Sequence, residues 1–274
     1  MQSGVKYMRR LDDRVMASEE AADVFDQWEV GQERWMFVSP HDDDAVIGAG
    51  LTIQVGMAAG AEVYVVITTD GRMGYCRIPQ RRTITRIRSE EAREAYRMLG
   101  LPPERLRCLG FPDCNLNAYR GRHFTTIGDP TEIEGASGLQ NAFPYVLRQI
   151  RPTRVFLPTP TDLHPDHRIV YEEMLISLFH AQGSIWPELG PPIVRIPVVY
   201  EFATYCDFPE PPQIRLVTPV AFLERKLEAI QCFASQEQIE VLVKVQRDVG
   251  PVEYLRQVAF NFYSPEKYAA LFEG

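Results

Sequence analysis

The chain has 274 residues, of which 45% are hydrophobic and 24% charged, a composition typical of a folded globular protein with one large core. Its formal net charge of −8, without any block of basic residues, argues against a nucleic-acid-binding protein. No uninterrupted apolar run reaches the roughly 18–20 residues that a membrane-spanning helix needs, so we expect no transmembrane segment.

Five cysteines are scattered along the chain, and none forms a Cys-x-x-Cys pair. An odd number of isolated cysteines is typical of reduced thiols in a cytosolic protein. Residues 1–20 contain no apolar core of a secretory signal, which also predicts a cytoplasmic location. We therefore expect a cytoplasmic enzyme, which could form a homo-oligomer.

Residues 1–34 are polar and acidic, with a helical spacing of apolar residues around Ala17–Trp28. They predict a helical N-terminal extension packed on a single domain that spans residues 35–274. Within that domain, predicted strands alternate with predicted helices. The strands cover residues 35–39, 62–69, 106–109, 154–157 and 195–203, and the helices cover residues 44–60, 83–99, 138–150, 166–180, 221–233 and 239–248.

This alternation predicts an α/β fold, a Rossmann-like three-layer sandwich with a mostly parallel sheet and helices on both faces. Functional sites in such sheets form outside the carboxyl ends of the strands. Two polar clusters follow predicted strands directly, at residues 39–44 and 164–168, and together they contain three of the five histidines. We therefore expect a metal site at the carboxyl ends of these two strands.

The residue types in the two clusters indicate a zinc site. Two histidines and one carboxylate suit a zinc ion that keeps one position open for water. His41 and Asp44 are three residues apart in a tight strand-to-helix turn, which can direct both side chains to one point. The second cluster offers His164 and His167 for the third ligand. Another divalent transition metal fits the same residues.

The remaining polar groups complete a hydrolytic site. Asp42 or Asp43 could act as a general base. The histidine that does not bind metal could polarise a carbonyl or protonate a leaving group, and Asp166 could orient its imidazole. A simpler alternative is that the aspartates only cap the helix that follows them.

These residues resemble the PIG-L/LmbE-like family of zinc-dependent de-N-acetylases, which includes N-acetylglucosaminyl-phosphatidylinositol deacetylases. The family's first motif, His-Pro-Asp-Asp-Glu, stands here as His41-Asp42-Asp43-Asp44-Ala45, and its second, His-Pro-Asp-His, is intact as His164–His167. Further similar segments are Thr68–Gly71, the Arg88-x-x-Glu91-Ala92 helix and the late helix from Lys226 to Ser235-Gln236. The resemblance covers roughly residues 35–240.

The resemblance implies one role for each residue of the two clusters. His41, Asp44 and His167 would be the metal ligands. Asp43 would be the general base that activates water. His164 would stabilise the oxyanion or protonate the leaving amine, and Asp166 would hold its ring.

Two residues depart from the family pattern, because Asp42 replaces a proline and Ala45 replaces a glutamate. That glutamate is neither ligand nor base in the family, so we expect activity to survive in a divergent branch. We predict substrate contacts at three residues: Arg72, Arg88 and Asp113.

The leading hypothesis is a zinc-dependent hydrolase that removes an acetyl or other acyl group from the amide nitrogen of an amino sugar or glycoside-like small molecule. An alternative enzyme is a zinc-dependent hydratase or lyase for an unsaturated acid, in which Arg72 and other basic residues would hold carboxylates. A third hypothesis is a metal-binding protein without catalysis, which an intact Asp43 beside an intact ligand set disfavours.

Overall fold

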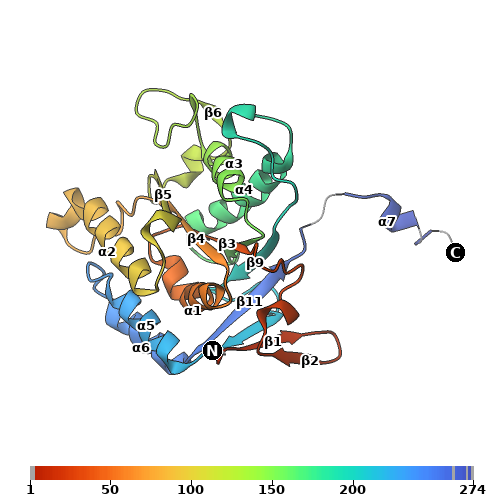
Figure 1. Cartoon of the computed structure of the whole chain (residues 1–274). Coiled ribbons are helices and arrows are strands. Elements are labelled where there is room, and N and C mark those ends of the chain that lie inside the picture. Colours follow the sequence, from red (N-terminus) through yellow and green to blue (C-terminus); the bar gives the residue numbers. More distant parts are fainter. Residues whose placement is uncertain (1–3, 261–262, 270, 273–274) are drawn as a thin grey trace.

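The computed structural model describes residues 4–260, 263–269 and 271–272, which form a mixed α/β fold around a nine-stranded sheet (Figure 1). Its strands lie in the order β2-β1-β10-β11-β9-β8-β3-β4-β5. They are β1 (Lys6–Arg10), β2 (Val15–Ser18), β3 (Arg34–Ser39), β4 (Glu62–Thr69), β5 (Leu106–Phe111), β8 (Arg154–Pro158), β9 (Val198–Phe202), β10 (Ile214–Val217) and β11 (Val252–Val258). A separate two-stranded sheet pairs β6 (His123–Phe124) with β7 (Ala136–Ser137).

Helices cover both faces of the large sheet (Figure 1). One face carries α3 (Leu139–Ile150) and α4 (Pro165–Gln182), and the other carries α1 (Asp44–Ala58), α2 (Ile84–Met98), α5 (Val220–Gln231) and α6 (Ile239–Val249). A short α7 (Glu266–Ala269) and the 3-10 turns at Ala21–Asp23, Ile78–Arg82, Pro103–Arg105, Leu116–Tyr119 and Pro187–Leu189 complete the described elements. None of the helices in the described residues is both long and apolar enough to cross a membrane.

The strand β3 shows why three layers form. Its side chains alternate between the faces of the sheet, as the two-residue period of a strand requires. Trp35 and Phe37 enter the core beneath α1, whereas Met36 and Val38 enter the core beneath α3 and α4. Two apolar cores therefore hold helices on both faces, and the predicted three-layer arrangement is confirmed.

The prediction of a mostly parallel sheet is wrong. Among the described residues, β9, β8, β3, β4 and β5 form four parallel pairs, but β2, β1, β10, β11 and β9 form four antiparallel pairs. The missed strands are short or alternate between buried and exposed residues, as β10 does. They therefore lack the continuous apolar run that marks a strand buried on both faces.

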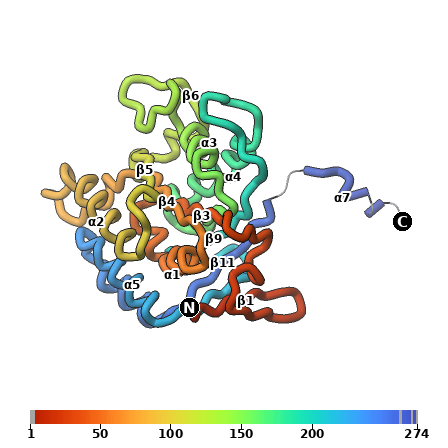
Figure 2. The backbone as a smooth tube through the Cα atoms, viewed as in Figure 1, coloured from red at the N-terminus to blue at the C-terminus, as the bar shows by residue number. Residues whose placement is uncertain are grey.

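For the described residues 4–34 the predicted helical structure is also wrong, apart from the 3-10 turn at Ala21–Asp23. Lys6–Arg10 and Val15–Ser18 form an antiparallel hairpin, and Tyr7 lies opposite Leu216 of β10. Figure 2 shows this N-terminal hairpin beside the late strands of the sheet. Pairing with a strand from the other end of the sequence outweighs the weak local helical spacing.

A bend in α1 follows the turn that carries the aspartate cluster. Ala49 has non-helical angles, with φ −139° and ψ 17°. Beyond it, the Glu253 carboxylate of β11 accepts hydrogen bonds from the backbone N–H groups of Leu51 and Thr52, at 2.9 and 2.8 Å. Lys226 of α5 donates to the same carboxylate at 2.7 Å. Glu253 thus caps the second half of α1 and links this helix to α5 and the sheet.

Replacing Glu253 with glutamine is expected to lower the free energy of unfolding by about 1–3 kcal/mol, because a buried donor and the Lys226 ammonium lose their partner. Urea unfolding of the metal-free protein measures the change. Glu228→Gln on the exposed face of α5 is the matched control, and its effect should stay within about 0.5 kcal/mol. Equal effects of the two variants would contradict this role for Glu253.

Candidate active site

The two polar clusters meet at the carboxyl ends of neighbouring parallel strands. His41–Asp44 follow β3, and His164–His167 follow β8, which pairs directly with β3. His164 is the N-cap residue of α4, and its Nδ1 accepts a hydrogen bond from the Asp166 backbone N–H at 3.2 Å. The sheet topology therefore brings together residues that lie more than a hundred positions apart in the sequence.

Three donor atoms from these clusters converge on one point. The Asp44 Oδ2 lies 3.0 Å from His41 Nδ1 and 3.0 Å from His167 Nε2, and the two nitrogens are 3.3 Å apart. Bond lengths of about 2.0–2.1 Å in a tetrahedral zinc site require ligand atoms about 3.3 Å apart. The second carboxylate oxygen, Asp44 Oδ1, is buried without a hydrogen-bond partner. The residues therefore fit a divalent metal ion with nitrogen and oxygen ligands.

Charges around this point favour a cation. Burial lowers the pKa of His167, but the Asp44 carboxylate outweighs burial and raises that pKa to about 9. Burial raises the pKa of Asp44, but the two imidazoles hold it well below its usual range. Asp44 is thus an ionised carboxylate in a buried position, and it draws positive charge to the atoms that surround it.

A carboxylate lies beside the second ring nitrogen of each imidazole. Asp113 Oδ1 lies 3.2 Å from His41 Nε2, and Asp162 Oδ2 lies 3.3 Å from His167 Nδ1. Hydrogen bonds to the second ring nitrogen fix the tautomer of a metal-binding histidine, and these two carboxylates lie within 3.3 Å of that nitrogen. Burial raises the pKa of Asp113, but its contact with His41 lowers it to about 2. Asp162 was missed from the sequence, although it stands only two residues before His164.

The side chain of Asp43 faces the cavity rather than capping the helix that follows it. It is the N-cap residue of α1, yet its side chain makes no capping hydrogen bond. Its Oδ2 accepts a hydrogen bond from Gln236 Nε2 and lies 3.4 Å from Arg88 Nη2. Asp43 lines the same cavity as His41 and His164, so its carboxylate faces the space where a substrate would bind. The capping alternative for Asp43 therefore finds no support in the geometry.

Asp42, the residue in the family's proline position, forms a buried two-pronged ion pair with Arg88. Arg88 Nε donates to Asp42 Oδ2 at 2.7 Å, and its Nη2 donates to Asp42 Oδ1. Burial raises the pKa of Asp42 to about 6, although the Arg88 guanidinium lowers it. The carboxylates of Asp42 and Asp43 thus both interact with the guanidinium of Arg88. Of the three nitrogens of that group, only Nη1 has no hydrogen-bond partner among the described residues.

His164 presents a hydrogen-bond donor to the cavity. Its Nδ1 accepts from the Asp166 backbone, which leaves the proton of the neutral ring on Nε2. Burial, and next the positive charge of His41, lower the pKa of His164, which favours this neutral form. The expected carboxylate contact from Asp166 is not made. Asp166 Oδ2 instead accepts from the Cys114 backbone N–H at 2.8 Å and lies 3.5 Å from His41 Nε2.

The cavity beside these residues has a volume of about 270 Å³. Of the predicted substrate contacts, Asp113 and Arg88 line it. Arg72 does not line it, because its side chain is half exposed and pairs with Asp70 at 2.7 Å. Gln236, Gln238 and Tyr205 also line the cavity and were missed. All three lie in loops, between β9 and β10 or between α5 and α6. Only Gln236 belongs to a segment, Ser235-Gln236, that resembled the family in the sequence.

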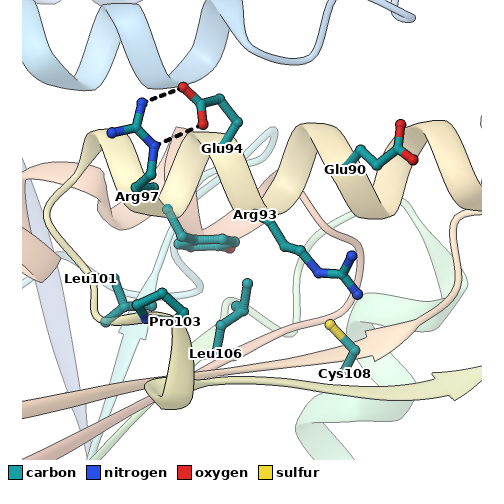
Figure 3. Close-up of a pocket in the computed structure, with 9 residues that line it drawn as sticks. Glu90, Arg93, Glu94, Arg97, Leu101, Pro103, Leu106 and Cys108 are labelled. Atoms are coloured by element: carbon teal, nitrogen blue, oxygen red, sulfur yellow. Dashed lines mark hydrogen bonds and ion pairs between the residues drawn. The ribbon is translucent and has the colours of Figure 1, made fainter.

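A larger cavity of about 500 Å³ lies between α2 and β5 (Figure 3). Arginine and glutamate side chains of α2 border it, and Arg97 pairs with Glu94 along the helix. It contains no histidine and no aspartate among its described lining residues. Although this cavity is larger than the one beside His41 and His164, it lacks their residue types, so we do not take it as the candidate active site.

The chain matches one family model by its sequence and several solved structures by its fold. The sequence model of the GlcNAc-PI de-N-acetylase (PIG-L) family matches residues 36–176, about half of the chain. No curated protein sequence matches the chain significantly.

Three solved structures share the fold. N,N'-diacetylchitobiose deacetylase from Pyrococcus horikoshii has a TM-score of 0.65 and 24% identity over 87% of this chain and 88% of that one. A conserved protein from Thermus thermophilus has a TM-score of 0.64 and 24% identity over 84% of this chain and 97% of that one. The 4-carboxy-2-hydroxymuconate hydratase from Pseudomonas putida has a TM-score of 0.61 and 20% identity over 85% of this chain and 99% of that one.

Proposed function

This chain belongs to the GlcNAc-PI de-N-acetylase (PIG-L) family, and on that premise we propose that it is a zinc-dependent deacetylase of an N-acetylated amino sugar or glycoside. The convergence of His41 Nδ1, Asp44 Oδ2 and His167 Nε2 within 3.3 Å of one another, in a cavity that the Asp43 side chain also lines, carries the proposal. A divalent metal bound there would lower the pKa of water and polarise an amide carbonyl.

The protein's own groups supply the proton transfers. Asp43 takes a proton from the attacking water, and Gln236 and Arg88 fix the position of its carboxylate. His164 donates a hydrogen bond from Nε2 to the oxygen on which negative charge develops. Loss of the amine then requires a proton, and Asp43 can give the leaving nitrogen the proton that it took from the water. The products are acetate and a free amine.

The electrostatics of the cavity favour an amide over an unsaturated acid. Likeness of fold to a deacetylase and to a hydratase does not separate the two reactions. A hydratase for an unsaturated acid needs cations to hold carboxylates, but the charge of Arg88 is matched by Asp42 and Asp43. Arg72 is paired with Asp70. A neutral sugar amide needs no free cation to bind, so these ion pairs do not disfavour it. A metal-binding protein without catalysis would have no use for the placement of Asp43.

Acetate release tests the proposal. The zinc-loaded protein should release one acetate and one primary amine per turnover from at least one member of a panel of N-acetylated amino sugars and glycosides. His167→Ala should lose both the metal, measured by elemental analysis, and the activity. His123→Ala in the exposed hairpin should lose neither. No hydrolysis of any amide by metal-loaded protein would overturn the proposal, and hydration of an unsaturated acid would favour the alternative.

A further inference from the structure

Cys114 brings a thiol to the edge of the catalytic cavity. It follows Asp113 in the turn after β5, and its side chain is exposed. Its backbone has a φ of 60°, a left-handed conformation that is costly for any residue other than glycine. Its backbone N–H donates to Asp166 Oδ2 at 2.8 Å, which fixes the turn. The Cys114 Sγ consequently lies 3.7 Å from His164 Nε2.

Asp113 adds a carboxylate to this pair. Its side chain is only 6% exposed, and its Oδ2 accepts from the Met73 backbone N–H at 3.0 Å. Its Oδ1 has no hydrogen-bond partner of acceptable geometry, although His41 Nε2 lies 3.2 Å away. The donor atoms of Asp113, Cys114 and His164 all lie within 4.8 Å of one another. An oxygen, a sulfur and a nitrogen donor therefore surround one point.

We propose that Asp113, Cys114 and His164 form a second site for a thiophilic divalent cation such as Zn²⁺, and that its occupation inhibits the enzyme. This set shares no residue with the His41, Asp44 and His167 set. Zinc bonds of about 2.3 Å to sulfur and 2.0–2.1 Å to nitrogen place these two ligand atoms about 3.6 Å apart, close to the 3.7 Å between Cys114 Sγ and His164 Nε2. Thiolate and imidazole ligands select zinc over magnesium or calcium.

Metal binding at the second site and the proposed catalysis both need His164 Nε2, the first as a lone-pair donor and the second as a hydrogen-bond donor. As a ligand, His164 Nε2 must offer its lone pair, so its proton moves to Nδ1 and the hydrogen bond from the Asp166 N–H is lost. The Cys114 S–H bond breaks, its electron pair goes to the metal, and one proton is released to solvent for each ion bound. The lost hydrogen bond makes this site weaker than the first one. His164 can then no longer donate a hydrogen bond to the developing oxyanion, which is why inhibition follows.

A cobalt titration of the metal-free full chain tests the binding site without any substrate. The first equivalent of Co²⁺ should give no thiolate-to-cobalt charge-transfer band, and the second should give one. Cys114→Gly should abolish that band, and this variant is expected to fold because glycine suits the left-handed backbone. Cys108→Ser, at another exposed cysteine, should keep the band. A band with the first equivalent, a band that persists in Cys114→Gly, or no second equivalent would each overturn the site.

Acetate release tests the inhibition, which rests on the proposed function. Excess Zn²⁺ should inhibit the wild-type enzyme, and in Cys114→Gly the concentration that halves the rate should rise at least about 10-fold, the lower end of the effect of removing a supporting contact at a metal site. The inhibition of each protein is expressed relative to its own rate with one equivalent of zinc, so a change in the basal rate of the variant does not affect the comparison. Equal inhibition of both proteins would overturn the inhibitory role. A cobalt band from a protein that hydrolyses no amide would instead contradict the proposed function and leave the second site in place.

Discussion

Asp43→Asn is expected to lower turnover by about 10²–10⁴-fold, the usual contribution of a positioned general base. The carboxylate is not one of the three atoms that converge on the metal point, so the bound metal should remain. An asparagine oxygen can still accept the hydrogen bond from Gln236, so the local structure should survive. Initial rates of acetate release and elemental analysis of the same samples measure the two effects.

The matched control is Asp70→Asn. Asp70 follows β4, near the site, but it pairs with Arg72 and does not line the cavity. Its turnover should stay within a factor of about three of wild type, because its carboxylate lies outside the cavity and pairs with the half-exposed Arg72. Loss of metal in Asp43→Asn would make Asp43 a ligand, and full turnover in that variant would remove it from the mechanism.

The central strands and the site were predictable because their signals are local. β3, β4 and β8 are buried on both faces and appear in the sequence as short apolar runs. A ligand residue directly after each of two such strands must lie at the same edge of a parallel sheet. That argument placed His41 and Asp44 beside the pair His164 and His167, and only the resemblance to the family singled out His167 as the third predicted ligand.

Contacts between distant segments were beyond the reach of the sequence. Gln236 meets Asp43 across 193 positions, and Arg88 meets Asp42 across 46. Periodicity places Arg88 on a helix but cannot say which carboxylate its guanidinium meets. The antiparallel half of the sheet was missed for a related reason, because β1 is stabilised by β10 rather than by its own residues. The side chains that contact Asp42 and Asp43 could therefore be identified only from the three-dimensional structure.

The ion pair between Asp42 and Arg88 leads to the largest expected effect on stability. Arg88 is only 3% exposed, and it neutralises the buried carboxylates of Asp42 and Asp43. Arg88→Met leaves both carboxylates buried without that charge. Removal of one partner from a buried ion pair costs about 3–5 kcal/mol. Urea unfolding should show this loss, and it must be measured on metal-free protein, because metal binding to the folded state adds stability of its own.

A double-mutant cycle separates the ion pair from the packing of the long Arg88 side chain. Asp42→Asn together with Arg88→Met removes one charge of each sign, so the double variant should be more stable than Arg88→Met alone by at least about 1 kcal/mol. Arg97→Met on the exposed side of the same helix is the control, and it should cost less than about 1 kcal/mol. Strict additivity of the two single changes would mean that Asp42 and Arg88 do not interact. Asp42 would then be an unexplained replacement for proline rather than the partner that keeps Arg88 beside Asp43.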